Sequence, residues 1–364
     1  MMDEITEKRR RLDAFVEQQH LDAIYLSQVA NFTWLTAGLE PVVMINSDRA
    51  EAGLLVSREK RYVICNSIEY PRLRDEDRLE DQGYEFHVTP WYQGMPRFDD
   101  LVLGKRWATD WPIPGVQDLS SAISRLRFQL TPQEIERYRR VGFDSGQAIE
   151  HTARAVRPGM SELQIAGLMA AQALDAGITP IMLLVGTDER IFHFRHPIPT
   201  EKKLERYAML AICGRRWGLV ASATRFVHFG SLPDELKNKQ EACAFVDVTF
   251  NAATTEGRRV SEVFQRAMDA YAERGFPGEW QKHNQGGAAG YLSRDYEGTP
   301  TCEEIVLAEQ AFAWNPSITG IKSEDTMIVH PGGAEFITVT GEWPSLSVNL
   351  DARTWERPAI LTLP

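Results

Sequence analysis

One helix of this sequence opens with Arg157-Pro158-Gly159-Met160-Ser161-Glu162-Leu163, and a similar start, Glu256-Gly257-Arg258-Arg259-Val260-Ser261-Glu262-Val263, follows about one hundred residues later. Each start has a long helical pattern before it and strand-like sequence after it. The pattern favours two copies of a helix–helix–strand half, although two similar helix starts can also arise by chance.

Strong capping signals fix where the helices of the first half begin. The run Leu130-Thr131-Pro132-Gln133-Glu134 combines an N-cap threonine, a proline in the first turn and a glutamate that completes a capping box. This helix is predicted to reach about Ala155. The next is predicted to begin at Ser161, with Gln164 closing its capping box, and to stop at Gly177.

Ahead of this boundary, helical and strand-like patterns alternate. An amphipathic helix is predicted over 5–20, followed by a buried strand at 23–26 and further strands at 52–56 and 62–65. Such alternation indicates an α/β domain, so we expect one domain over 1–128 and an α+β domain over 129–364. The later strand candidates are 304–308, 311–314, 326–329 and 336–339.

Composition narrows the classes of protein. With 364 residues, 43% hydrophobic and 25% charged, the chain has the profile of a globular protein of two domains. A net charge of −11 argues against a nucleic-acid partner, and no apolar stretch is long enough to span a membrane. The N-terminus has no signal-peptide core. The four cysteines are far apart, so we expect reduced thiols in a cytoplasmic protein: Cys65, Cys213, Cys243 and Cys302.

Three segments concentrate polar side chains. The loop 193–200 holds two histidines and an arginine before a Pro-x-Pro, as catalytic loops do, although a solvated turn has the same composition. The segment 283–295 is rich in small residues but lacks the spacing of a nucleotide-binding glycine loop. The segment 315–325 places a lysine near carboxylates, either in a buried site or in an exposed hairpin.

Taken together, these segments resemble the pita-bread family of methionine aminopeptidase, aminopeptidase P, prolidase and creatinase. The stretch Asn31-Phe32-Thr33-Trp34-Leu35-Thr36-Ala37-Gly38 is similar to the NxxYLTG of the family's N-terminal domain. The resemblance covers most of the chain. It implies a C-terminal pita-bread fold with pseudo-twofold symmetry and an N-terminal creatinase-like α/β domain.

Metallopeptidases of this family bind two metal ions through two Asp, one His and two Glu. Segment 210–225 resembles DxGxxxxGYxxDxTR, segment 283–290 resembles HGxGHxxG, and segment 322–325 resembles R-x-E-D/N. The residues at the five ligand positions are Ala211, Ser222, Gly287, Asn315 and Glu324. One carboxylate among neutral side chains has neither the ligand number nor the charge for two divalent ions, so we expect no metal and no cofactor.

Creatinase shows that a member of this family can hydrolyse a substrate without metal, using a histidine as general acid and base. The resemblance implies the same role for His196, with His193 as its possible substitute, and further catalytic roles for His283 and Glu324. The substrate-binding candidates are His193, Arg294, Asn315 and Lys322. The expected function is metal-independent hydrolysis of a small C–N bond in an amide, amidine or amino-acid derivative.

Two alternatives stay open. One is a non-catalytic pita-bread protein that holds a peptide or small ligand. The other is an Xaa-Pro aminopeptidase-like metallohydrolase with a rebuilt metal site that recruits Asp295 or Asp325. The partners that we expect are a small molecule or short peptide and, from the family's habit, a second copy of the chain in a homodimer.

Overall fold

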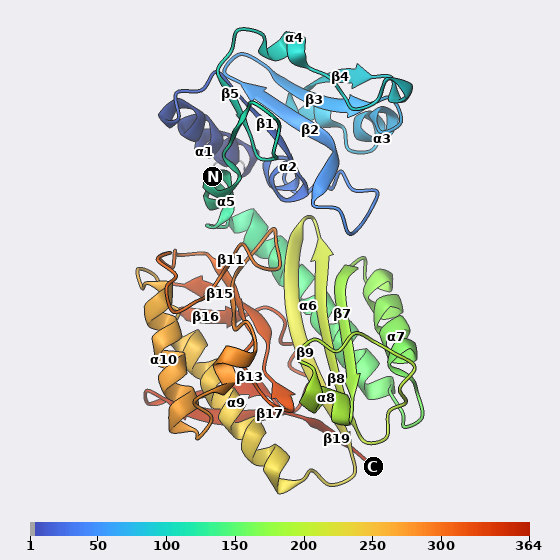
Figure 1. The fold of residues 1–364 in the computed structure, drawn as a ribbon, viewed down its shortest axis with the longest axis vertical. Helices are drawn as coiled ribbons and strands as arrows, with labels where there is room; N and C mark the ends of the chain where they lie inside the picture. Colours follow the sequence, from blue (N-terminus) through green and yellow to red (C-terminus); the bar gives the residue numbers. More distant parts are fainter. Residues whose placement is uncertain (1–3) are drawn as a thin grey trace. The chain divides into compact units, whose positions relative to one another are not determined.

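The computed structural model describes residues 4–364, which divide into two compact units, one ending at Arg127 and the other spanning Phe128–Pro364. Each is an independent packing unit with its own sheets (Figure 1). None of the described helices is long and apolar enough to cross a membrane.

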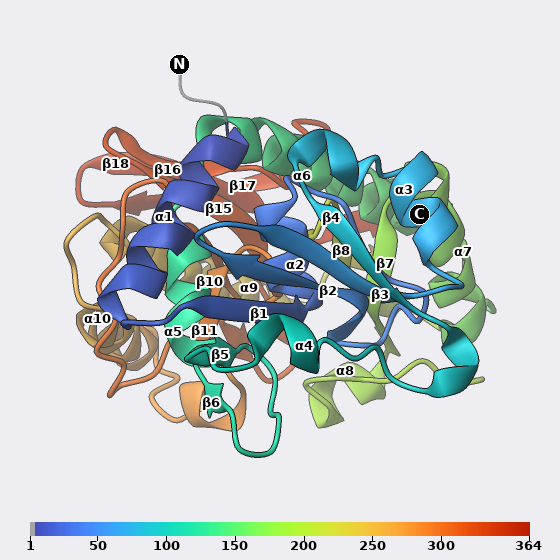
Figure 2. The same ribbon diagram turned by 90° about the horizontal axis from the view of Figure 1, so that it is seen from above.

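The first unit is built on a six-stranded mixed sheet in the order β4-β3-β2-β1-β5-β6, whose first four strands lie side by side in Figure 2. Its strands are β1 (Ala23–Gln28), β2 (Arg49–Ser57), β3 (Arg61–Asn66), β4 (Glu85–Thr89), β5 (Trp107–Thr109) and β6 (Gln117–Asp118). Its helices are α1 (Glu4–Gln18), α2 (Val29–Leu35), α3 (Tyr70–Asp75), η1 (Leu79–Gln82), η2 (Trp91–Gln93), α4 (Asp99–Val102), α5 (Ser120–Ser124) and η3 (Arg125–Arg127). The predicted α/β character of this part of the chain is confirmed.

The second unit repeats a pattern of two helices followed by antiparallel strands, as the paired helix starts predict. Its helices are α6 (Pro132–Ala155), α7 (Glu162–Asp175), α8 (Glu189–His193), α9 (Asp234–Ala253), α10 (Val260–Glu273) and η4 (Glu279–Lys282). Its first strands are β7 (Thr179–Thr187), β8 (Tyr207–Arg216) and β9 (Leu219–Phe229). The later strands are β10 (Gly286–Ala289), β11 (Tyr296–Glu297), β12 (Ala311–Trp314), β13 (Ser317–Ile318), β14 (Ile321–Lys322), β15 (Asp325–His330), β16 (Gly333–Phe336), β17 (Ser345–Leu350), β18 (Arg353–Pro358) and β19 (Leu361–Leu363).

Both predicted capping boxes are confirmed. The Thr131 hydroxyl accepts from the Glu134 amide at 3.3 Å, and the Glu134 carboxylate accepts from the Thr131 amide at 2.7 Å. Ser161 and Gln164 exchange the same two bonds at the start of α7. These bonds satisfy amide groups that have no partner inside the helix, so they set the first residue of each helix.

Two predicted strands are wrong. Residues 304–308 form an irregular segment that wraps the start of α10: the Glu304 carbonyl accepts from the Val260 amide at 2.9 Å. The strand predicted at 336–339 ends instead at Phe336. Beyond it, one backbone bond runs from the Ile337 amide to the Thr326 carbonyl at 2.9 Å, and the Thr338 hydroxyl then donates to the Asp325 carboxylate at 2.7 Å.

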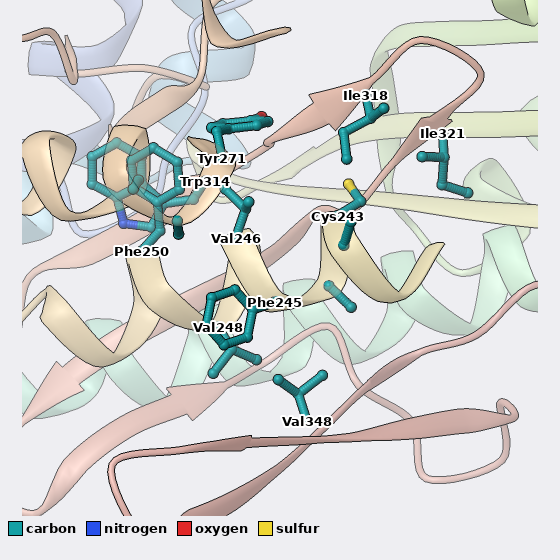
Figure 3. Packing of buried hydrophobic residues seen from close by; sticks show 14 of the residues in the cluster. Cys243, Phe245, Val246, Val248, Phe250, Tyr271, Trp314, Ile318, Ile321 and Val348 are labelled. Atoms are coloured by element: carbon teal, nitrogen blue, oxygen red, sulfur yellow. The ribbon is translucent and has the colours of Figure 1, made fainter. Parts of the chain in front are cut away.

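Helix α9 lies at the centre of the second unit's core. Figure 3 shows Cys243 pointing towards Ile318 and Ile321 of the β13–β14 hairpin, while Val348 of β17 lies on the opposite side of the helix. The strand-borne Trp314 stacks on Phe250 of the same helix, with ring centroids 4.4 Å apart. This packing holds in place the hairpin that leads into the candidate site.

Candidate functional site

The central hairpin β8–β9 provides the floor of the site. Ala211 pairs with Thr224 and Cys213 with Ser222 across the two strands. Because side chains alternate along a strand, these four point to one face, and all four are buried. The Cys213 sulfur lies 3.2 Å from the Ser222 hydroxyl, so these four positions offer small side chains and no charge.

Glu324 lies against this face and is held there by three donors. The Thr224 hydroxyl donates to its Oε2 at 2.7 Å, the Lys322 ammonium lies 3.4 Å from the same oxygen, and Arg294 donates to Oε1 at 3.1 Å. Burial acts to raise the pKa of Glu324, but the two cations and the Thr224 bond outweigh it and lower the pKa to about 2. The carboxylate is therefore ionised and fully engaged at neutral pH.

A buried chain of ion pairs fixes the residues on either side of this carboxylate. Ser323 donates to Asp247 at 2.5 Å, and Asp247 accepts from Arg357 Nε at 2.6 Å. Asp325 lies between two guanidinium groups, at 2.8 Å from Arg357 and 3.0 Å from Arg225. Since both neighbours of Glu324 are anchored in this way, its backbone has little freedom to move.

Two histidines from distant loops meet beside this carboxylate. The Nε2 atoms of His196 and His283 lie 3.0 Å apart, so one ring donates its N–H and the other accepts. Burial, Lys322 and His196 lower the pKa of His283 to about 2, and burial together with Lys322 lowers the pKa of His196. Both rings are therefore neutral at pH 7, which leaves one ring nitrogen free to accept a proton.

A second ion pair ties the two histidine loops together. Arg195, next to His196, bonds the carboxylate of Glu279 and donates to the Thr319 hydroxyl at 3.0 Å. The Thr319 amide donates to Glu279 at 2.8 Å. Burial acts to raise the pKa of Glu279, but bonds from Lys282, Arg195 and Thr319 lower it to about 2, so the pair persists at neutral pH.

Two buried polar atoms at the site have no hydrogen-bond partner among the described residues: Asn315 Oδ1 and His283 Nδ1. Asn315 is 5% exposed and His283 is 9% exposed. Trp314 pairs with Asp325 across β12 and β15, which puts Asn315 and Glu324 side by side where the strands end. An unpartnered atom at such burial calls for a ligand or water to bond it.

The structure thus brings together six of the predicted residues, which we call the polar cluster: His196, His283, Arg294, Asn315, Lys322 and Glu324. His193 does not join it, because this residue lies at the exposed end of α8, where its ring contacts Phe194. Within the described residues, no hydrogen bond or ion pair connects His193 to the polar cluster. Its role in substrate binding stays a prediction.

The sequence did not identify two residues that fix Glu324 and its neighbours in place. Thr224 belongs to the motif-like segment 210–225 but is not one of its ligand positions, and the sequence did not predict its bond to Glu324. Arg357 lies near the C-terminus, far from every motif. The available sequence signal is an arginine at a position of a strand pattern where a buried apolar residue is expected.

The residues at the family's ligand positions do not fit a pair of divalent ions. Ala211 offers no donor atom, and a Cβ at Gly287 would lie 2.3 Å from the Tyr296 carbonyl oxygen, so a side chain there has no room. Glu324 is already bonded by two cations that would repel a metal. In the described part of the chain, no group of three or more His, Cys, Asp or Glu is placed to hold a metal. The metal content of the protein stays a prediction.

Comparison with known proteins gives one consistent family. Residues 136–331 match the sequence profile of Metallopeptidase family M24. The chain is 24% identical over 360 residues to the Xaa-Pro dipeptidase of Lactobacillus helveticus, covering 91% of this chain and 96% of that protein. It is 19% identical over 362 residues to the Xaa-Pro dipeptidase of Pyrococcus horikoshii, with 93% and 99% covered.

Solved structures show the same fold. The Xaa-Pro dipeptidase from Bacillus anthracis superposes with a TM-score of 0.80 at 19% identity, covering 99% of this chain and 100% of the other. The N-terminal domain of the FACT subunit SPT16 from chickpea superposes with a TM-score of 0.70 at 13% identity, with 93% and 97% covered. At such identities the likeness establishes the pita-bread fold and leaves the chemistry to be argued from the site.

Proposed function

Because the chain belongs to metallopeptidase family M24, we propose that it is a hydrolase that cleaves a C–N bond in a short peptide or an amino-acid derivative. We further propose that it does so without the dinuclear metal. The observation that carries this proposal is the neutral pair His196–His283, 3.0 Å apart, beside two cations that are held by a single carboxylate.

In the proposed reaction, His196 acts as the general base and later as the general acid. It takes a proton from water as the water oxygen bonds the carbonyl carbon of the substrate, and it returns the proton to the nitrogen as the C–N bond breaks. The products are a carboxylic acid and an amine. His283 passes or shares the proton through the Nε2–Nε2 contact.

The remaining members of the polar cluster supply charge and position. Lys322 and Arg294 have only 5% and 15% of their side chains exposed, so they act in a medium where their charges are poorly screened. They can bind a substrate carboxylate or stabilise the oxyanion that forms on the carbonyl. Glu324 holds both cations in place.

The names of the relatives favour an Xaa-Pro peptidase over a creatinase-like hydrolase. For this chain, such a peptidase would need a rebuilt metal site. One of the two carboxylates that such a site would recruit is Asp325, which is bonded to Arg225 and Arg357 and whose side chain has no exposed surface. The donor set therefore supports the metal-free mechanism, while the comparisons support the peptide substrate.

The test combines elemental analysis with a turnover screen. Protein purified without chelator is analysed for Mn, Zn, Fe and Co, and the same batch is incubated with dipeptides, Xaa-Pro dipeptides and N-acyl amino acids. We expect no stoichiometric metal and a product that is lost in His196→Ala and Glu324→Gln but kept in His151→Ala, a change on the exposed face of α6. Stoichiometric metal would establish the rebuilt site instead.

Ligand binding with no product would support the non-catalytic alternative. A thermal-shift measurement on the same compounds detects it, since a ligand of the folded state raises the melting temperature. We also propose a homodimer, as the family resemblance implies. Light scattering of the purified chain tests that assembly.

A further inference from the structure

The polar cluster carries one more positive charge than negative. Arg294 and Lys322 are cations, Glu324 is the carboxylate of the cluster that bonds both of them, and both histidines are neutral. The charged groups that act on His196 are these same three side chains. Arg195, which also acts on His283, is neutralised by its own partner Glu279.

Both oxygens of Glu324 already face a cation of the polar cluster. Its Oε1 accepts from Arg294, and its Oε2 accepts from Thr224 and lies 3.4 Å from Lys322. A ligand ammonium group that entered the polar cluster would therefore meet two cations and no free carboxylate. A ligand carboxylate would meet two buried donors that are already positioned.

One of the unpartnered atoms of the polar cluster is a carbonyl oxygen, which accepts hydrogen bonds. Asn315 Oδ1 is buried beside Glu324 and has no partner among the described residues. A neutral N–H from a ligand would satisfy it, whereas a tertiary amide, such as the bond before proline, has no N–H to give. The ligand therefore needs an uncharged N–H donor, such as a secondary amide.

From these features we infer that the polar cluster binds an N-acylated amino acid, with its free carboxylate on Arg294 and Lys322 and its amide N–H on Asn315 Oδ1. This inference rests on the proposed function in taking the polar cluster as the substrate site. Hydrolysis of such a compound adds water across the amide bond and yields a carboxylic acid and a free amino acid. A dipeptide with a free N-terminus and an Xaa-Pro dipeptide are both disfavoured.

The inference is tested by calorimetry with three matched series. The first contains the N-acetyl derivatives of the twenty amino acids, the second the same residues as Ala-Xaa dipeptides, and the third the N-acetyl amino acid amides. We expect the best N-acetyl amino acid to bind at least about tenfold more tightly than its Ala-Xaa and amide counterparts, and N-acetylproline to bind weakly. Tighter binding of Ala-Xaa, or no binding of any N-acetyl amino acid, overturns the inference.

Variants of Asn315 test the contact to the ligand's amide N–H separately from the contacts to its carboxylate. Asn315→Leu should weaken the best secondary amide at least about tenfold and leave N-acetylproline unchanged, whereas Asn238→Leu on the exposed side of α9 should change neither. Asn315→Asp adds a carboxylate and should admit the Ala-Xaa series. Melting curves check that each variant folds, and the wild-type series decides the question even if a variant does not.

The outcomes distinguish this inference from the proposed function. Tight binding of N-acetyl amino acids with no product refutes hydrolysis but keeps the ligand class. Product from dipeptides with free N-termini keeps hydrolysis but refutes the ligand class.

Discussion

The imidazole rings of His196 and His283 come from loops 87 residues apart and meet edge to face, with ring planes at 76° and Nε2 atoms 3.0 Å apart. Neither histidine can gain a proton without placing a charge next to Lys322. The pair is therefore neutral in the folded protein. Because the same rings can bind protons once the chain unfolds, the free energy of unfolding must decrease at acid pH.

We predict that His283 makes the protein less stable as the pH falls from 6.5 to 4.5. Its pKa is lowered from 6.5 to about 2, so the unfolded chain binds a proton in this range and the folded chain does not. Above pH 6.5 this histidine does not reduce the free energy of unfolding. Below pH 6.5 it lowers that free energy by on the order of 1 kcal/mol per pH unit. Urea unfolding at several pH values measures it.

The pH range separates this histidine from Glu324. The pKa of that carboxyl falls from its ordinary value of 4.5 to about 2 on folding, which places its own loss of stability below pH 4.5. His283→Asn should flatten the slope between pH 6.5 and 4.5, and His151→Asn, at an exposed position, should not. An unchanged slope in His283→Asn would show that the buried ring is already protonated in the folded state.

Glu279→Gln should lower kcat more than it lowers affinity. The change removes the charge that binds Arg195 and so loosens the loop that carries His196, while Arg294 and Lys322 still bind the ligand. We expect kcat to fall about tenfold and the dissociation constant to change less than about threefold, because a misplaced proton carrier affects mainly the chemical step. Glu273→Gln, at the exposed end of α10, is the control. Equal losses in kcat and affinity would contradict a positioning role.

Local signals explain why much of the second unit could be predicted. The capping boxes at Thr131 and Ser161 depend on residues three positions apart, and both predictions are confirmed. The strand predicted at 304–308 is wrong because its backbone bonds the residues that lead into α10: the Val306 amide donates to the Arg258 carbonyl and the Glu304 carbonyl accepts from the Val260 amide, both at 2.9 Å. No period in the sequence reveals these bonds. Local pattern predicts how a segment begins and ends, but not which distant segment takes up its hydrogen bonds.

For the site, the sequence identified side chains but not their contacts. Six predicted residues lie in the polar cluster because the family motifs mark the strand ends that meet there. The triple bonding of Glu324 and the open acceptor of Asn315 depend on the register of β12 and β15, which the sequence does not state. The same holds for Arg357, whose two carboxylate partners lie 110 and 32 residues away.

Arg357→Met should destabilise the fold by about 3–5 kcal/mol, because it leaves Asp247 and Asp325 with less compensation in a fully buried site. Arg353→Met is the matched control, since Arg353 lies on the same strand but is exposed over the Trp355 ring. Urea unfolding of the two variants measures the difference. A loss below about 1 kcal/mol in Arg357→Met would mean that the ion-pair chain contributes little net stability.

Restoring the family's metal ligands should fail at one position. A Cβ at Gly287 would lie 2.3 Å from the Tyr296 carbonyl oxygen and 2.7 Å from the Gly298 amide nitrogen, and both contacts are backbone atoms that cannot rotate away. Gly287→Ala alone should therefore cost about 1–3 kcal/mol of unfolding free energy. Gly167→Ala, on the open face of α7, should instead stabilise by about 0.5–1 kcal/mol, since alanine is the better helix former.

The fourfold variant Ala211→Asp, Ser222→Asp, Gly287→His and Asn315→Glu then tests the site as a whole. We expect it to bind less than one equivalent of Mn or Zn by elemental analysis, because the histidine cannot enter and Lys322 and Arg294 still bond the one native carboxylate. Two equivalents of metal in a folded variant would show that the backbone around residue 287 shifts to make room for the histidine side chain. In that case the metal site would have been lost through its ligands alone.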